Sequence, residues 1–382
     1  MAVRSKWQSL PTEAINPATL GIDKLDANEI VEVMLTEDRR MLDAVRREHE
    51  RIAVGVEMIA STLRKGGRVI FVGAGTSGRL GILESAEMPP TFSTDPQLVQ
   101  AVMAGGREAI FAAKEGVEDN YEEGARSITR LRPTKKDIVI GVSASGMTQF
   151  VRGALTRARK AGARIIFVTC DPGTELQTFV DLTIAPGVGA EVIAGSTRLK
   201  AGTATKLVLN MLTTGAMVRI GKTYGNLMVD VHTGSEKLKD RARRIVNIVT
   251  GIDYDEADRL LKKAHWNVKA AIVMQKTGLP YPKALARLRR AHDSMRQAIG
   301  EDIEPRLRGM LQGHAEASGK GAPEGAPLRA AARSAAPRST AARTTPDARG
   351  GPSGPPTAET PPRDQGTARR AGGSARTTRA GG

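Results

Sequence analysis

The spacing of hydrophobic residues changes along the chain in a regular order. Short apolar runs typical of buried strands lie at residues 68–72, 99–103, 137–142, 164–169 and, more weakly, 182–185. Stretches with apolar residues at helical spacing lie between most of them, at residues 78–87, 108–131 and 149–161. Strands that alternate with helices predict an α/β fold, a doubly wound and mostly parallel five-stranded sheet with helices on both faces. Such sheets bind ligands at the carboxyl ends of their strands.

Longer helices are predicted on either side of this region. Thr36 followed by two acidic residues is typical of a helix start, and apolar residues then recur at helical spacing until Gly66. A second long helix is expected from about residue 198 to 220. Pro89 and Pro90 should end the helix at residues 78–87, because proline cannot continue the helical hydrogen-bond ladder.

Composition divides the chain into three parts. We predict an α/β ligand-binding domain with an N-terminal helical extension at residues 1–238, and a small UBA-like module of three helices at residues 239–312. Residues 313–382 are rich in Ala, Gly, Pro, Ser, Thr and Arg, and from residue 315 onward they include Leu328 but no Ile, Val, Phe, Tyr or Trp. The small apolar surface of this tail cannot offset the entropy lost on ordering it. We therefore expect the tail to be disordered.

The charge balance narrows the choice of partners. The chain has 57 Lys and Arg against 41 Asp and Glu, a net charge of +16. Residues 315–382 hold eleven Lys or Arg against five Asp or Glu, and this tail is either a polyanion-binding segment or a low-complexity extension. Aromatic residues make up only 3% of the chain and do not interleave with basic ones, so we expect no nucleic-acid partner. Small phosphorylated ligands fit the positive charge better.

The sequence also argues against several other classes of protein. The single Cys170 excludes an intramolecular disulfide framework, and the first twenty residues lack the apolar core of a secretory signal, so the expected compartment is the cytoplasm. The longest apolar runs have the length of strands, and we expect no membrane span. The five histidines are scattered, and we predict neither a metal nor another cofactor.

Two loops rich in Gly, Ser and Thr follow the first and third predicted strands. Glycine lets the backbone approach a phosphate, hydroxyls donate to its oxygens, and the N-terminus of the next helix adds a favourable dipole. The residues that we assign to substrate and phosphate binding here are Gly75, Thr76, Ser77, Gly78, Arg79, Ser143, Ser145, Gly146 and Thr148. The first loop taken alone could be an ordinary capped turn, but the pair resembles the sugar isomerase (SIS) domain, which binds phosphosugars.

Two glutamates follow the first loop on the same predicted helix. Glu84 and Glu87 lie three residues apart and therefore share a face. That face is either solvated, as is usual for glutamate, or turned toward the ligand. Local sequence alone favours the solvated face.

A longer string changes that balance. Residues 75–92, GTSGRLGILESAEMPPTF, closely resemble the signature of the N-acetylmuramic acid 6-phosphate etherases, a branch of the SIS superfamily, and the resemblance spans about residues 8–300. It implies an enzyme, expected to be a homodimer, that needs no cofactor and converts N-acetylmuramic acid 6-phosphate and water to N-acetylglucosamine 6-phosphate and D-lactate. Glu87 takes the position of the acid that assists lactate departure, and Glu118 that of a second acid or base. Which of the two carries the proton stays open.

The resemblance assigns further residues and leaves alternatives. Glu191, Ser196 and Lys200 lie on the approach to the long helix at about 198–220, where SIS proteins position substrate or a proton-transfer residue. Met147 and Ile15 stand where the family commonly has arginine, which removes positive charge near the substrate. The alternatives are a non-catalytic phosphosugar regulator, similar to the glucokinase regulatory proteins, and an isomerase or deaminase with Glu191 as base. A DNA-binding regulator would need a helix-turn-helix, and residues 1–35 are too short and irregular for one.

Overall fold

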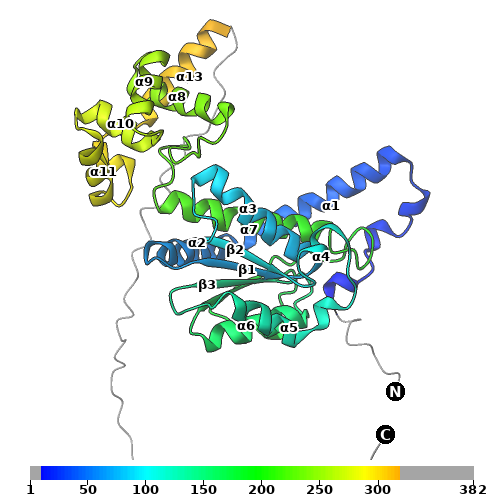
Figure 1. Cartoon of the computed structure of the whole chain (residues 1–382). Coiled ribbons are helices and arrows are strands. Elements are labelled where there is room, and N and C mark those ends of the chain that lie inside the picture. Colours follow the sequence, from blue (N-terminus) through cyan, green and yellow to red (C-terminus); the bar gives the residue numbers. More distant parts are fainter. Residues whose placement is uncertain (1–9, 319–382) are drawn as a thin grey trace, which may run out of the picture. The chain divides into compact units, whose positions relative to one another are not determined.

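Five parallel strands form one sheet in the computed structural model (Figure 1). The structure describes the backbone of residues 10–318 and the burial of side chains in residues 10–312. The strands are β1 (Val69–Gly73), β2 (Val99–Met103), β3 (Ile138–Val142), β4 (Arg164–Val168) and β5 (Leu182–Ile184). Their order is β2-β1-β3-β4-β5, and every neighbouring pair is parallel. The predicted α/β fold is confirmed, and each strand lies within one residue of its predicted bounds.

Helices cover both faces of the sheet (Figure 1). One layer consists of α1 (Ala27–Arg47), α2 (His49–Arg64), α3 (Gly75–Phe92) and α7 (Lys200–Arg219), and the other of α5 (Tyr121–Arg130) and α6 (Gln149–Lys160). Successive side chains of a strand point to opposite faces, so Phe71 packs in the core of the first layer and Ile70 in that of the second. Short 3₁₀ helices lie in the connections: η1 (Pro11–Glu13), η2 (Pro17–Thr19), η3 (Ile22–Lys24) and η5 (Glu175–Thr178).

The first long helix begins earlier than its sequence pattern indicated. α1 starts at Ala27, and Thr36 lies inside it. The Asp26 carboxylate accepts a 2.9 Å hydrogen bond from the backbone of Glu29, and the Glu29 carboxylate accepts one from the backbone of Asp26. This capping box supplies partners for backbone N–H groups that a helix start leaves free, so the helix begins there. A turn at Glu48 then separates α1 from α2.

Two more helix ends differ from the prediction. α3 continues through Pro89 and Pro90 to Phe92: each proline removes one backbone N–H donor, and the helix ends two residues after Pro90, so the prolines shorten it less abruptly than predicted. The predicted helix at residues 108–131 is interrupted and consists of α4 (Glu108–Phe111), η4 (Val117–Asp119) and α5. Gly116, with a φ of 76°, starts η4 in a left-handed conformation that ends any continuous helix.

A second core lies beyond α7. Where three helices were expected, the described residues contain α8 (Glu236–Thr250), α9 (Tyr254–Lys263), α10 (Val268–Thr277), α11 (Tyr281–Arg290), α12 (Met295–Ile299) and α13 (Glu304–Ser318). The helices are short because His265 and Trp266 have positive φ and because Gly278 and Gly300 end α10 and α12 in the left-handed region. The prediction of a disordered tail was wrong for residues 313–318, which belong to α13, and the rest of that tail, from 319 onward, lies outside the described residues. Within residues 10–318, no helix is both long and apolar enough to cross a bilayer.

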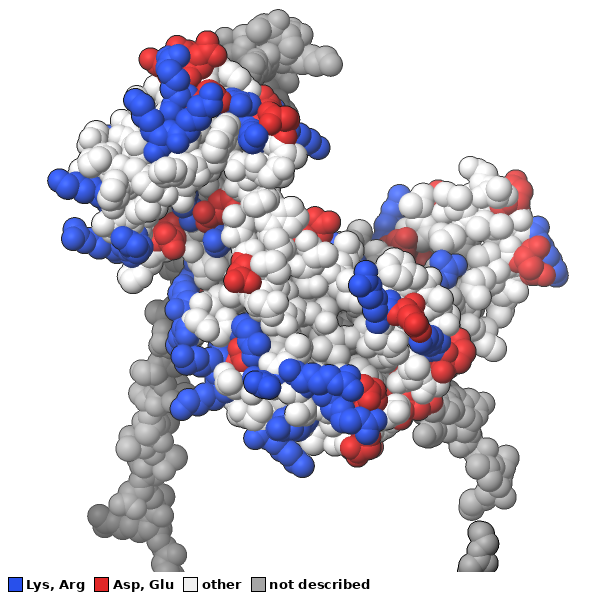
Figure 2. Space-filling view, viewed as in Figure 1, with Lys and Arg blue, Asp and Glu red and all other residues white. Residues whose placement is uncertain are grey.

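Basic side chains gather over α5 and α6 beside acidic ones (Figure 2). Arg126 and Arg130 each lie 3.0 Å from the carboxylate of Glu123. The last turn of α6 carries three basic residues, which complement the negative end of the helix dipole. The positive charge on this face therefore has a structural explanation that needs no anionic ligand.

Candidate active site

A cavity of about 330 Å³ lies at the carboxyl ends of β1 and β3. β1 leads into α3 on one face of the sheet, whereas β3 leads into α6 on the other. The loops after these neighbouring strands therefore separate and leave a crevice between them, as is typical of ligand sites in doubly wound sheets. Its volume is within the range of small-molecule sites. Of the assigned binding residues, those that line the cavity are Gly75, Thr76, Ser77, Arg79, Ser143, Ser145 and Thr148.

The first loop is tightly packed and opens a helix toward the cavity. A Cβ on Gly73 would lie 2.7 Å from the backbone nitrogen of Gly78, and one on Gly78 would lie 2.9 Å from the carbonyl oxygen of Gly73. Both positions therefore require glycine, and Gly78 supports the turn from a buried position instead of lining the cavity. The residue before α3 is Ala74, whose methyl group cannot cap the helix. The first N–H groups of α3 are thus suited to an anion.

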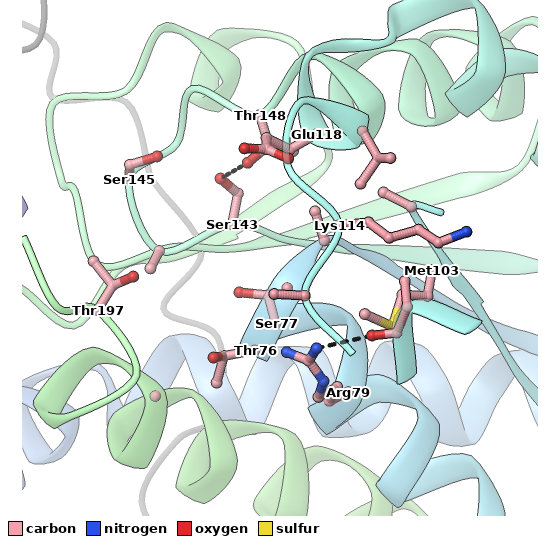
Figure 3. Close-up of a pocket in the computed structure, with 18 of the residues that line it drawn as sticks. Thr76, Ser77, Arg79, Met103, Lys114, Glu118, Ser143, Ser145, Thr148 and Thr197 are labelled. Atoms are coloured by element: carbon pink, nitrogen blue, oxygen red, sulfur yellow. Dashed lines mark hydrogen bonds between the residues drawn. The ribbon is translucent and has the colours of Figure 1, made fainter. Parts of the chain in front are cut away.

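The second loop presents hydroxyl groups to the same cavity (Figure 3). The Ser143 and Thr148 hydroxyl oxygens lie 2.8 Å apart, and Ser145 Oγ accepts a 3.4 Å hydrogen bond from the backbone of Met147. Gly146 has a φ of 73° and lies so close to Thr174 that a Cβ would be 2.7 Å from its side chain. Gly146 is buried and shapes the loop, while the three hydroxyls face the ligand space.

Arg79 lines the cavity, but its guanidinium already donates hydrogen bonds to backbone carbonyl groups. Its guanidinium donates 2.8 Å hydrogen bonds to the carbonyl oxygens of Ile110 and Ala109, and a 3.4 Å bond to that of Ala112. Figure 3 draws Arg79 with one of these bonds. These carbonyls lie at the end of α4, directly before the segment that carries Glu118. Arg79 therefore ties the first loop to the Glu118 segment.

The two glutamates at the catalytic positions lie apart in a single chain. Glu118, in η4, is half-buried, lines the cavity and lies on the side of Ser143 and Thr148 in Figure 3. Glu87 is exposed and lies outside the cavity lining, twelve residues beyond Gly75 on α3. At 1.5 Å per residue, these twelve residues place it about 18 Å along the helix from the loop. Glu84, which was predicted to share its face, is instead buried and accepts hydrogen bonds from Asn210 and Thr213 of α7.

The residues assigned before α7 lie outside the cavity lining. The buried Glu191 carboxylate accepts 2.9 Å hydrogen bonds from the backbone N–H groups of Lys200 and Ala201. Its negative charge therefore caps the N-terminus of α7. Lys200 is buried, and its ammonium lies 2.5 Å from the carboxylate of Glu37. Ser196 is half-buried between two residues that do line the cavity, Gly195 and Thr197.

Other cavity residues were not singled out by the sequence. Glu13 and Lys114 contribute charge, and Thr197 and Thr205 contribute hydroxyls. The signature at residues 75–92 includes neither Glu13 nor Lys114. Cys170 is nearly fully buried, and burial raises the pKa of its thiol to about 12, so the reactive thiolate is scarce.

The chain is similar to several known proteins. The family model described as "Glucokinase regulatory protein N-terminal SIS domain" matches residues 51–159. An N-acetylmuramic acid 6-phosphate etherase from Salinibacter ruber is 48% identical over 77% of this chain and 95% of its own length. One from Clostridioides difficile is 46% identical over 76% of this chain and 96% of its own. Among solved structures, a phosphoheptose isomerase from Neisseria gonorrhoeae aligns with a TM-score of 0.40 at 18% identity, covering 50% of this chain and 100% of that one.

The extent of the match to the relatives decides the family. The identity is close to one half over about three quarters of this chain and along nearly the whole length of each relative. The predicted resemblance is confirmed, and the chain belongs to the N-acetylmuramic acid 6-phosphate etherase family.

Proposed function

We propose that this protein is an N-acetylmuramic acid 6-phosphate etherase, a carbon–oxygen lyase that releases D-lactate and N-acetylglucosamine 6-phosphate. The observation that carries the proposal is the cavity at the ends of β1 and β3, where phosphate-binding groups and Glu118 meet, in a chain of this family. The matched relatives cover about three quarters of this chain and bear the etherase name, so a non-catalytic regulator is not favoured.

The phosphate of the substrate fits the two loops. α3 and α6 both begin at the cavity, and the dipole of each helix favours negative charge there. Thr76, Ser77, Ser143, Ser145 and Thr148 add hydroxyl donors. A phosphate held between these loops places the sugar chain in the remaining space, toward Glu118.

The ether is cleaved by elimination followed by addition of water. In the open-chain sugar the hydrogen at C2 is acidified by the neighbouring aldehyde. Glu118 removes this proton, the C3–O bond breaks, and a second carboxyl group, assigned to Glu87, protonates the departing lactyl oxygen. Water then adds at C3 and a proton returns to C2, so the sum of the steps is hydrolysis. Each positioned acid or base contributes roughly 10²–10⁴-fold to the rate.

We further propose that the site is completed by a second copy of the chain. Glu87 lies about 18 Å along α3 from the loop of its own site, well beyond the span of a 330 Å³ cavity. Close to it, Leu83 on the same helix is 41% exposed, and α1 exposes Val31, Leu35 and Leu42. Apolar helix faces of this kind favour a symmetric dimer, which can bring Glu87 of one copy to Glu118 of the other.

A complementation experiment tests the paired site. Glu87→Gln and Glu118→Gln should each abolish release of D-lactate from N-acetylmuramic acid 6-phosphate. When the two inactive variants are unfolded, mixed in equal amounts and refolded, roughly a quarter of wild-type activity should return, because half of the dimers are hybrids with one intact site. Mixtures that stay inactive, although hybrids form, would show that both glutamates act within one chain.

Exchange of the C2 proton in D₂O tests the two roles. The Glu87→Gln variant should still exchange the C2 proton of the substrate while releasing no lactate. The Glu118→Gln variant should do neither. The opposite pattern would reverse the roles of acid and base. Wild-type protein that is folded and yet releases no lactate would refute the etherase function itself.

A further inference from the structure

The charges around the cavity are poorly matched to an anionic ligand. Among the described residues, its charged lining consists of two cations, Arg79 and Lys114, and three anions, Glu13, Glu115 and Glu118. The substrate of the proposed reaction carries two anionic groups, the phosphate and the carboxylate of the lactyl ether. The helix N-termini and hydroxyls of the two loops serve the phosphate, but the second anion needs a cation of its own.

Arg79 is poorly placed to supply that cation. Its guanidinium already donates to the carbonyl oxygens of Ile110, Ala109 and Ala112. Moving it would leave these carbonyls without this donor and would release the segment that leads to Glu118.

Lys114 has a partner that it can exchange easily. Its ammonium lies 2.5 Å from the carboxylate of Glu108, whose side chain is 81% exposed. Ion pairs with so exposed a partner contribute little to stability, because water solvates both charges well when they separate. A substrate carboxylate can therefore replace Glu108 at little cost.

The stem of Lys114 is held in the wall of the cavity. Gly105 has a φ of 78°, and a Cβ there would lie 2.9 Å from Ala109, 3.3 Å from Lys114 Cδ and 3.4 Å from Val117, so the Lys114 stem packs closely against this glycine. In Figure 3, Lys114 extends past Met103, on the opposite side of the cavity from Ser145 and Thr197. Its charge is thus on the other side of the cavity from Ser145, one of the second-loop hydroxyls that are assigned to the phosphate.

We propose that Lys114 binds the carboxylate of the lactyl group. This inference rests on the proposed etherase function and adds a specificity-determining residue to it. Rotation of the outer side-chain torsions carries the ammonium from Glu108 into the cavity while the stem stays against Gly105. Lys114 lies four residues before Glu118 on the same segment.

Two ligands that differ in the lactyl group separate this role from phosphate binding. N-Acetylmuramic acid 6-phosphate has the carboxylate, whereas N-acetylglucosamine 6-phosphate has only the phosphate. Lys114→Met should raise KM for the first about 10- to 100-fold, the range for a lost hydrogen bond between charged groups, and leave Kd for the second within about twofold. Lys114→Arg should restore most of the affinity. Glu108→Gln should leave KM unchanged or lower it.

Controls keep the outcomes distinct. Lys160→Met removes an exposed lysine at the far end of α6 and should change neither constant. Equal weakening of both ligands by Lys114→Met would assign Lys114 to the phosphate and overturn the proposal, as would no weakening at all. An increase of KM by Glu108→Gln as large as that by Lys114→Met would show that the ion pair acts structurally. If wild-type protein releases no lactate, the etherase function fails, and calorimetric Kd values for the two phosphosugars still decide the role of Lys114.

Discussion

The buried ion pair between Lys200 and Glu37 gives the sharpest prediction about stability. The two side chains are each only 4% exposed and lie 2.5 Å apart. Asn16 donates a 2.9 Å hydrogen bond to the same carboxylate and a 3.2 Å bond to the carbonyl oxygen of Ala190. The pair therefore joins the N-terminal segment, α1, the loop before α7 and the start of α7.

Lys200→Met should destabilise the fold substantially. Removing one partner of a buried ion pair costs about 3–5 kcal/mol, because the other charge stays buried without compensation. Arg40 also contacts Glu37 and still compensates part of its charge, so the cost should be about 3 kcal/mol, at the lower end of this range. For a domain of this size the melting temperature should fall by roughly 6–12 °C. Urea unfolding followed by circular dichroism measures the free energy directly.

Two further variants isolate the ion pair. Lys200→Met combined with Glu37→Leu should recover part of the lost stability, since an apolar pair has no buried charge to desolvate, but Asn16 loses the carboxylate that accepts its hydrogen bond. Lys206→Met on the same helix should cost less than about 1 kcal/mol, because Glu84 keeps its bonds from Asn210 and Thr213.

The pH dependence gives an independent check. Burial alone would raise the pKa of Glu37, but hydrogen bonds from Lys200 and Asn16 outweigh it and hold the pKa below its ordinary value of 4.5. A carboxyl group with a lowered pKa stabilises the fold at pH values above its ordinary pKa. That contribution is lost as the pH falls through the pKa of the folded state. The difference in unfolding free energy between wild type and Lys200→Met should therefore shrink below pH 4.5. An unchanged melting temperature together with a collapse of kcat/KM would refute this reasoning and place Lys200 in contact with substrate.

Three other changes probe the loops and the core. Gly146→Ala should lower the free energy of unfolding by at least about 2 kcal/mol and raise KM, because the φ of 73° and the close contact with Thr174 exclude a Cβ. Gly21→Ala, in open space, should be neutral in the same melting and kinetic assays. Glu191→Gln should lower stability by about 1–2 kcal/mol and keep lactate release, since Glu191 caps α7; loss of all turnover without loss of stability would support a role as base. Cys170 should resist a thiol reagent at pH 8 in the native protein and react once per chain after denaturation, and rapid native labelling would contradict its burial.

The strands and the ligand-binding loops could be predicted from the sequence because their signals are local. Four apolar strands and the glycine-rich turns after β1 and β3 depend on residues adjacent in the chain. The parallel sheet then brings both loops to one edge, and the cavity lies there. Helix ends were less certain, since the capping box at Asp26 and the tolerance of Pro89 and Pro90 in a last turn depend on backbone hydrogen bonds.

The partners of charged side chains could not be predicted in this way. Arg79, Glu191 and Lys200 all appeared suited to a ligand, yet in the fold they contact backbone carbonyls, backbone N–H groups and Glu37. A buried charge must find a compensating group, and the nearest one is usually far away in the sequence, as Glu37 is from Lys200.

The sequence by itself determined the α/β fold, the phosphate-binding loops and, through its long signature, the family. Tertiary structure alone decided that Glu118 lines the cavity, that Glu87 lies about 18 Å along α3 from the loop of its own chain, and that Lys114 stands in the cavity wall. The physical reason is one of range. Hydrophobic spacing and turn chemistry act over a few residues, whereas a binding site is formed by distant segments whose relative positions depend on the packing of the whole core.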